Sequence, residues 1–351
     1  MKHIGIVNAF LAALLFGAST PFAKLLMGDI SPVVLAGLLY LGSGLGLSAW
    51  LVARRLASAS ESEASLTGKD MPPLAGAIFT GGIVAPVLLM TGTNMIPASA
   101  SSLLLNLEGV CTTLLAWFVF KESFDRRIFI GMLLIIAGGV VLTFTPHLNL
   151  GGDFLLGGAL VAAACLCWGI DNNLTRKVSG GNPAQIAALK GLFAGSITLS
   201  AASMAGFPFP ALSSAFLAGV VGLAGYGVSL ILFILALRHL GTARTGAYFS
   251  IAPFAGAAIS FGVLAETPDT AFWVASLFMA AGVFLHLTET HAHDHTHDET
   301  EHGHRHVHDE HHQHAHDFEW NGKEPHTHVH RHEKMAHSHP HYPDIHHRHR
   351  H

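Results

Sequence analysis

The chain carries the stretch PASASSLLLNLEGVCTTLLAWFVFKESFDRRIFIGMLLIIAGGVVL at residues 97–142 and the stretch GTARTGAYFSIAPFAGAAISFGVLAETPDTAFWVASLFMAAGVFLH at residues 241–286. Moving residue 97 onto residue 241, a shift of 144, aligns the two stretches without a gap. Glu122 then meets Glu266, and Gly138 meets Gly282. The identities are few, but the apolar segments and the breaks between them fall at the same places. We therefore interpret the chain as two copies of one unit.

Composition places both copies in a membrane. Half of the residues are hydrophobic and only 12% are charged, whereas soluble domains carry roughly 25% charged residues. Ten apolar segments follow one another, each of about 18–25 residues and so long enough to cross roughly 30 Å of hydrocarbon. A soluble helical core is excluded because no polar helix face remains to meet water. The predicted spans are residues 4–27, 32–53, 72–91, 97–120, 127–145, 154–174, 184–205, 213–237, 241–265 and 270–288.

The repeat also sets the topology. Each copy contains five spans, and because five is odd the second copy enters the membrane from the opposite side. Inverted repeats of this kind are typical of secondary transporters. We expect an all-α integral membrane fold of ten transmembrane helices in two inverted five-helix repeats, at residues 1–145 and 146–288, followed by a tail at residues 289–351.

Charge indicates the orientation. If the N-terminus lies inside, the loops on the outer side, near residues 28–31, 92–96, 146–153, 206–211 and 266–269, contain neither lysine nor arginine. The positive-inside rule then predicts an inner-membrane protein with both termini in the cytoplasm. The inner loops carry Arg54, Arg55, Lys69, Lys121, Arg126, Arg127, Arg176, Lys177 and Arg238.

Glu108 is the sharpest candidate for a functional residue. It lies midway along the fourth span, next to the polar Asn106, and ionisable groups in the bilayer are costly and often functional. The matching part of the ninth span holds Pro253, which removes a backbone donor and breaks or kinks a helix. Interrupted spans at the midplane indicate a transporter's binding site. We expect Glu108 to bind a cationic group or a coupling proton; a packed structural glutamate is the alternative.

Four further residues are substrate or coupling candidates. Lys190 of the seventh span is expected to pair with Glu108, to contact an anionic substrate, or to extend to the cytoplasmic face. Asp171 and Asn172, near the inner end of the sixth span, either line a cytoplasmic vestibule or cap the helix, and Trp168 is a weaker candidate on the same span.

Other polar residues in the spans have a structural interpretation. Lys24 is expected to extend to the outer interface, and Glu122 and Glu266 sit at helix ends, where a structural role is expected. The cysteines Cys111, Cys165 and Cys167 fall within spans; positions two apart on a helix face different ways, so we expect small packing residues rather than a disulfide or thiolate site.

Three segments of the first copy have a recognisable pattern, FGASTPFAK at residues 16–24, ASASSLL at 98–104 and LAWFVFKE at 115–122, and the second copy has matching segments. On these segments the chain resembles the EamA branch of the drug/metabolite transporter superfamily over roughly residues 4–288. The resemblance implies ten helices, a central cavity and proton-coupled or exchange transport of metabolites, amino acids, nucleotide precursors or drugs, often outward. Two positions depart from the family: many members have a proline where this chain has Glu108-Gly109, and many have an arginine in the second helix, where this chain has Leu39-Tyr40.

The tail after residue 288 is different in kind, because histidines alternate with other polar residues along it. Such a segment cannot bury a core, so we expect disorder. Neutral imidazole binds zinc, nickel, cobalt and copper, and the tail is accordingly a candidate metal-binding or pH-responsive segment. The alternating candidates are His291, His293, His295, His297, His302, His304, His306, His308, His326, His328, His330 and His332.

Three functions remain open at this point. The first is a secondary, non-ATP transporter that exports a small organic metabolite and carries a metal-binding regulatory tail. The second is a transporter of a divalent transition metal or of a metal–ligand complex, and the third is a membrane-bound metal store or sensor. The sequence holds no phosphate loop or hydrolase motif, so we expect no enzyme activity and no required cofactor. The expected partners are the lipid bilayer, a small-molecule substrate and transition metal ions, with no nucleic acid.

Overall fold

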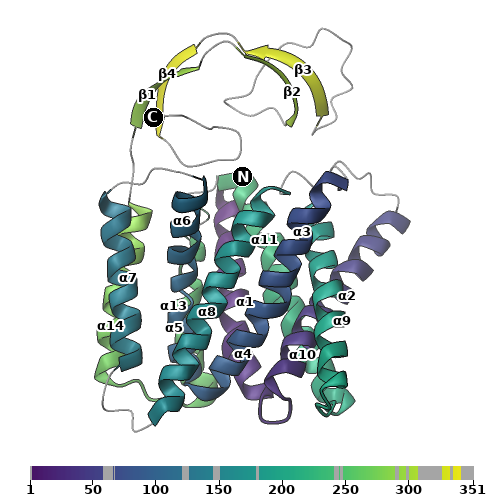
Figure 1. Ribbon diagram of the computed structural model, residues 1–351, viewed down its shortest axis with the longest axis vertical. Coiled ribbons are helices and arrows are strands. Elements are labelled where there is room, and N and C mark those ends of the chain that lie inside the picture. Colours follow the sequence, from purple (N-terminus) through teal and green to yellow (C-terminus); the bar gives the residue numbers. More distant parts are fainter. Residues whose placement is uncertain are drawn as a thin grey trace.

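The protein is a helical bundle whose spans run between two ends (Figure 1). The computed structural model describes residues 2–57, 66, 68–120, 126–144, 151–178, 182–240, 245, 248–288, 292–297, 300–306, 326–332 and 335–340. The N-terminus and the end of the last span lie at the same end of the bundle (Figure 1), which we call the termini end. The opposite end, which carries the α4–α5 turn, is the far end.

The first copy supplies the elements up to α7. Its third span is divided into two α-helices with a π-helical segment between them, and its fourth span is divided into two α-helices. The elements are α1 (Lys2–Leu26), α2 (Pro32–Leu56), the 3₁₀ turn η1 (Gly68–Asp70), α3 (Met71–Ala77), the π segment η2 (Ile78–Val84), α4 (Ala85–Met95), α5 (Ala98–Leu104), α6 (Leu107–Phe120) and α7 (Arg126–Phe144).

The second copy repeats this order. The eighth span of the chain again holds a π-helical segment, and in the ninth span a turn at Ser250 and Ile251 precedes the helix that begins at Ala252. The elements are α8 (Gly151–Arg176), α9 (Pro183–Met204), α10 (Leu212–Gly222), the π segment η3 (Leu223–Val228), α11 (Ser229–Leu240), α13 (Ala252–Leu264) and α14 (Thr270–Leu287).

The helices are suited to a membrane. Within the described part of the chain, nine helices are long and apolar enough to span a bilayer, and α13 is a shorter apolar helix of 13 residues. Large apolar side chains such as Leu133, Phe216 and Leu277 are exposed on the outside of the bundle, as lipid contact requires. The all-α membrane fold predicted from the sequence is thus confirmed. The count of ten spans is not fully confirmed, because the ninth is described only at residue 245 and from residue 248 onward.

Contacts between the two copies follow the predicted repeat. The second helices of the copies, α2 and α9, pack together, and so do the fifth helices, α7 and α14. The first helix of each copy packs against the third span of the other, α1 on α11 and α8 on α4. Each first helix also packs against the fourth span of the other copy, α1 on α13 and α8 on α6. This exchange of equivalent contacts is what an approximate two-fold relation between inverted copies produces.

Glycines of α7 and α14 show the same relation at the level of atoms. A Cβ on Gly282 would lie 2.5 Å from the Gly131 carbonyl oxygen, and one on Gly138 would lie 2.9 Å from the Ala275 carbonyl oxygen. The shift of 144 carries the first contact onto the second. Glycine at these positions lets the two helix backbones approach closely, as small residues do between membrane helices.

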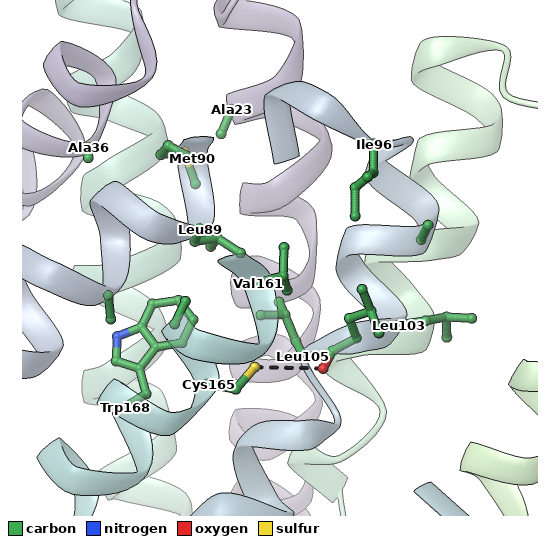
Figure 2. Close-up of a cluster of buried hydrophobic side chains, with 14 of the residues drawn as sticks. Ala23, Ala36, Leu89, Met90, Ile96, Leu103, Leu105, Val161, Cys165 and Trp168 are labelled. Carbon is green, nitrogen blue, oxygen red and sulfur yellow. Dashed lines mark hydrogen bonds between the residues drawn. The ribbon is translucent and has the colours of Figure 1, made fainter. Parts of the chain in front are cut away.

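The fourth span is broken where the sequence predicts an interruption. α5 ends at Leu104 and α6 begins at Leu107, and the Leu105 and Asn106 amides donate to carbonyls three residues back, at 3.2 and 3.1 Å. Cys165 Sγ of α8 approaches the Leu104 carbonyl oxygen at 3.6 Å (Figure 2). The break lies beside a buried apolar cluster that includes Leu103, Leu105 and Val161 (Figure 2). The Cys165 thiol of the second copy therefore contacts the Leu104 carbonyl at the break in the first copy.

The tail contains four described strands. β1 (Ala292–His297) pairs antiparallel with β4 (Met335–Pro340), and β2 (Thr300–His306) pairs antiparallel with β3 (His326–His332). The expected disorder of residues 289–351 is therefore not confirmed. Strand pairing satisfies backbone groups without any buried core, and a strict alternation of residue types is compatible with it. Of the candidate histidines, His291 and His308 lie outside the described residues.

Candidate functional site

Glu108 meets the sixth span across the bundle. The Asn172 Nδ2 atom donates to Glu108 Oε1 at 2.9 Å and also to Thr112 Oγ1 at 3.2 Å. Glu108 is the second residue of α6, directly after the helix break. Its side chain is half-buried and that of Asn172 is exposed. A carboxylate and an amide are therefore presented together at the middle of a broken span.

Asp171 and Lys190 form an ion pair beside this contact. Lys190 Nζ of α9 donates to Asp171 Oδ1 at 2.7 Å and to Oδ2 at 2.6 Å. Thr175 Oγ1 donates to Asp171 Oδ1 at 2.8 Å. The side chains of Lys190 and Asp171 are only 15% and 6% exposed. The pair is thus nearly inaccessible to solvent, and both oxygens of the Asp171 carboxylate accept hydrogen bonds.

This pairing corrects two expectations. Lys190 is not paired with Glu108 and does not extend to the cytoplasmic face, because its ammonium group binds Asp171; contact of Lys190 with an anionic substrate stays a prediction. The reason is helix rotation, since Asp171 and Asn172 differ by about 100° around α8 and so face α9 and α6 respectively. Asp171 does not cap α8 either, because the helix continues to Arg176.

Trp168 reaches the π-helical segment of the third span. Its Nε1 donates to the Gly81 carbonyl oxygen at 2.9 Å, and the Tyr40 hydroxyl donates to the same oxygen at 2.7 Å. A π turn leaves a carbonyl without its usual i+4 partner, which makes it available to side chains. A Cβ on Gly81 would collide with the Asp171 carboxylate, so this glycine makes room for the ion pair. The sequence marks Tyr40 only as a departure from the related family and does not mark Gly81, because neither a tyrosine hydroxyl nor a π turn alters the hydropathy pattern.

Aromatic rings surround this region. Phe16 lies edge-on to Trp168 and to Tyr226, with ring centroids 6.5 and 6.0 Å apart, and Tyr40 lies 5.3 Å from Tyr226. Trp168 precedes Asn172 by four residues on α8, so the two side chains lie on one face of that helix. The ring cluster therefore continues from the face of α8 that binds Glu108.

Two sequence candidates lie outside this group. Asn106 donates through Nδ2 to the Leu103 carbonyl oxygen at 2.9 Å and approaches Met279 Sδ of α14 at 3.8 Å, so it supports the break and points away from α8. Pro253 is buried in the first turn of α13. It lies where the ninth span is interrupted, as the sequence indicates, but no contact with Glu108 or Asn172 is described for it.

Charged residues at the far end make structural contacts. Lys24 Nζ donates to the carbonyl oxygens of Thr93, Asn94 and Ile96 at 2.6, 2.9 and 3.2 Å. It was expected to extend to the interface, but the free carbonyls at the end of α4 hold it. Glu266 accepts from the backbone amides of Ala98 and Ser99 at 2.7 and 2.9 Å, which confirms its structural role at a helix end. Glu122 lies outside the described residues.

The metal-ligand expectations rest on the tail. In the described part of the chain, no three His, Cys, Asp or Glu side chains lie close enough together to hold a metal ion. Cys165 is buried in the large apolar cluster, and Cys111 and Cys167 pack against that cluster, which is the packing role that the sequence indicates.

Comparison with known proteins agrees with this architecture. The EamA-like transporter family matches residues 3–144 and again residues 155–288. An uncharacterized transporter of Methanothermobacter thermautotrophicus strain Delta H is 27% identical over 301 residues, covering 80% of this chain and 85% of the relative. A protein of known crystal structure superimposes with a TM-score of 0.59 at 16% identity, covering 80% of this chain and 94% of the other, a likeness that concerns the fold alone. Two family matches, one in each copy, account for most of the chain, which therefore belongs to the EamA-like transporter family.

Proposed function

We propose that the protein is a secondary transporter that exports a small organic metabolite across the inner membrane without using ATP. The observation that carries the proposal is Glu108, a partly accessible carboxylate at the break of the fourth span, held by one amide from the opposite copy. Broken helices at the midplane are where secondary transporters bind substrate and coupling ions. The distribution of lysine and arginine between the loops supports cytoplasmic termini.

Transport of a divalent transition metal or of a metal–ligand complex is the second candidate, and the tail is the observation that favours it. Imidazole-rich segments bind zinc, nickel, cobalt and copper. The described spans, however, bring no three metal-ligating side chains together, and a metal path needs such groups. We therefore assign the tail a regulatory or metal-buffering role and the bundle an organic substrate. A metal store or sensor would need one anchoring helix, so the many spans weigh against it.

The first experiment measures export in cells that make the full chain, Glu108→Gln or Asp29→Asn. Asp29 is an exposed acid in the loop between α1 and α2, so its variant controls for loss of a carboxylate away from the site. We expect at least one organic solute to accumulate in the medium with the full chain and with Asp29→Asn, and to fall to background with Glu108→Gln. Equal export by all three proteins contradicts the proposal.

The role of the tail is tested with uptake and efflux of zinc, nickel, cobalt and copper, using the full chain and a chain that ends at Leu287. If the bundle carries organic solutes, removing the tail leaves organic export intact and abolishes only its response to metal. Metal flux that requires both Glu108 and the tail instead makes metal the cargo.

A further inference from the structure

The charged side chains inside the bundle leave one negative charge uncompensated. Glu108 and Asp171 each contribute one negative charge and Lys190 one positive charge. Lys190 gives hydrogen bonds to both oxygens of Asp171, so that pair is neutral. In the described part of the chain, no cation lies at ion-pair distance from Glu108, which receives only the Asn172 amide. In a low-dielectric setting, a lone carboxylate attracts a positive charge strongly.

Accessibility decides which of these charges a ligand meets. The Lys190–Asp171 pair is nearly closed off, whereas Glu108 is half-buried and Asn172 is exposed. A ligand entering the site therefore meets the carboxylate of Glu108 and the amide of Asn172 before it meets the lysine. An anion would find no free cation there and would be repelled by Glu108.

The rings around the site favour an organic cation over a bare metal ion. The Phe16 ring contacts those of Trp168 and Tyr226, and Trp168 lies one helical turn before Asn172, the partner of Glu108, on α8. Aromatic faces attract ammonium groups and pack against their apolar substituents. A divalent metal needs several oxygen, nitrogen or sulfur ligands, and a single described carboxylate does not supply them.

We propose that the substrate of this site is a monovalent organic cation, a protonated amine with an apolar or aromatic body. The ammonium group binds Glu108 and the apolar body packs against the rings. This inference rests on the proposed transport function, because it names the substrate class of the same site.

The test is binding of four ring compounds of similar size to the purified full chain, measured by calorimetry at neutral pH. The compounds are benzylammonium, benzyl alcohol, benzoate and the zwitterion phenylalanine, with larger arylalkylammonium ions as further cations. We expect the cations to bind best and to lose on the order of 30-fold in affinity in Glu108→Gln, as loss of a desolvated charge partner implies. Asp29→Asn retains the affinity.

Two results overturn the substrate class: binding of benzoate or phenylalanine in preference to every cation, or cation affinity that Glu108→Gln leaves unchanged. Proteoliposome flux separates this failure from failure of the transport function. Flux of a neutral or anionic solute that depends on Glu108 preserves transport and removes the cation assignment. Cation binding that depends on Glu108, without flux of any bound cation, preserves the site and removes the transport proposal.

A separate observation concerns the turn between α4 and α5 at the far end (Figure 1). The positive charge of Lys24 sits on the carbonyls that end α4, and the negative charge of Glu266 sits on the amides that begin α5. Both placements agree with the polarity of the helix ends. Lys24 and Glu266 also lie close enough to interact electrostatically. The turn is thus held on both sides by charges of opposite sign.

The Glu266 contact joins the two copies, since α5 belongs to the first and the α13–α14 connection to the second. Inverted-repeat transporters expose their site to one side at a time by moving one part against the other, so a contact that joins the copies at one end must release when that end opens. α5 can tilt without α6, because the break at Leu105 and Asn106 separates them. We infer that Glu266, with Lys24, acts as a releasable latch that keeps the far end closed.

Asp269 provides a matched control for the latch. Its side chain caps α14 by accepting from the Phe272 amide at 2.8 Å, so it makes the same kind of contact within one copy. The reporter is Ser101→Cys, which is buried behind the turn, in a chain whose three native cysteines are replaced by alanine. A membrane-impermeant thiol reagent is applied from the far side.

We expect Glu266→Gln to raise the labelling rate of Ser101→Cys about fivefold, the change in open population that corresponds to losing a cap of about 1 kcal/mol. Lys24→Gln acts in the same direction and serves if Glu266→Gln folds poorly. Asp269→Asn leaves the labelling rate unchanged. The inference is overturned if Glu266→Gln and Asp269→Asn are labelled at the same rate and Lys24→Gln also has no effect. Glu266 is then a cap of α5 that does not move during transport.

Discussion

Asp171 and Asn172 are neighbours on α8, yet the carboxylate of Asp171 and the Glu108 carboxylate that Asn172 contacts have opposite surroundings. Asp171 faces α9, is buried and is neutralised by Lys190. Asn172 faces α6 and gives a neutral amide to Glu108, which stays partly accessible. The Asp171–Lys190 pair is neutral without a ligand, whereas the charge of Glu108 has no cationic partner among the described residues. From this comparison we expect a charge within a span to be functional where the surrounding structure leaves it uncompensated, as at Glu108.

The largest expected effect comes from breaking the compensated pair. Lys190→Met leaves Asp171 buried without its cation, and such a loss costs about 3–5 kcal/mol of unfolding free energy. The double variant Lys190→Met/Asp171→Asn removes both charges and should regain most of this stability. Thermal unfolding of the purified protein in nanodiscs checks both. A double variant as unstable as the single one would show that the pair does not act as a unit.

Removing the uncompensated charge should affect transport instead of stability. Glu108→Gln keeps the shape and the hydrogen bond to Asn172, so the unfolding free energy should change by less than about 1 kcal/mol. Substrate flux should fall about 30-fold or more, since the charge partner is lost. Flux in proteoliposomes, measured beside unfolding, checks the prediction. A large loss of stability in Glu108→Gln would show that Glu108, like Asp171, has a structural role.

The space around the compensated pair can be tested through glycine. Gly81→Ala puts a methyl group against the Asp171 carboxylate, and overpacking of this kind costs about 1–3 kcal/mol. Gly109, beside Glu108, has nothing within 4 Å of an added Cβ, so Gly109→Ala is the control and should not destabilise the protein. Unfolding midpoints of the two variants give the comparison, and an equal loss for both would argue against the tight fit at Gly81.

The smallest expected effect is that of Tyr40→Phe. The variant removes one of two donors to the Gly81 carbonyl oxygen and leaves Trp168 in place. A single hydrogen bond is worth about 1 kcal/mol. Because the two donors share one acceptor, the loss should be greater when Trp168→Phe is already present. A double-variant cycle on unfolding free energies measures this, and strict additivity would show that the donors act independently.

Hydropathy predicted the spans well because lipid requires long apolar helices wherever the chain crosses. The predicted span 32–53 corresponds to Pro32–Leu56, and the predicted break near Glu108 lies at Leu105 and Asn106. Partners were harder to predict. The pairing of Lys190 with Asp171 depends on how α8 and α9 are rotated, and the attachment of Lys24 depends on where α4 ends. Neither quantity is encoded in the order of apolar residues within one span.

The two π-helical segments bear on the history of the chain. A shift of 144 residues carries Ile78–Val84 onto residues 222–228, over the second segment at Leu223–Val228. A π turn corresponds to one extra residue within a helix, and gaining that residue independently at the same place in both halves would be a coincidence. The extra residue is therefore best dated to the single ancestral unit, before duplication. The two halves have since diverged around the π turn. In the first half the Gly81 carbonyl accepts hydrogen bonds from Tyr40 and Trp168. The π turn has thus been kept longer than most of the sequence around it.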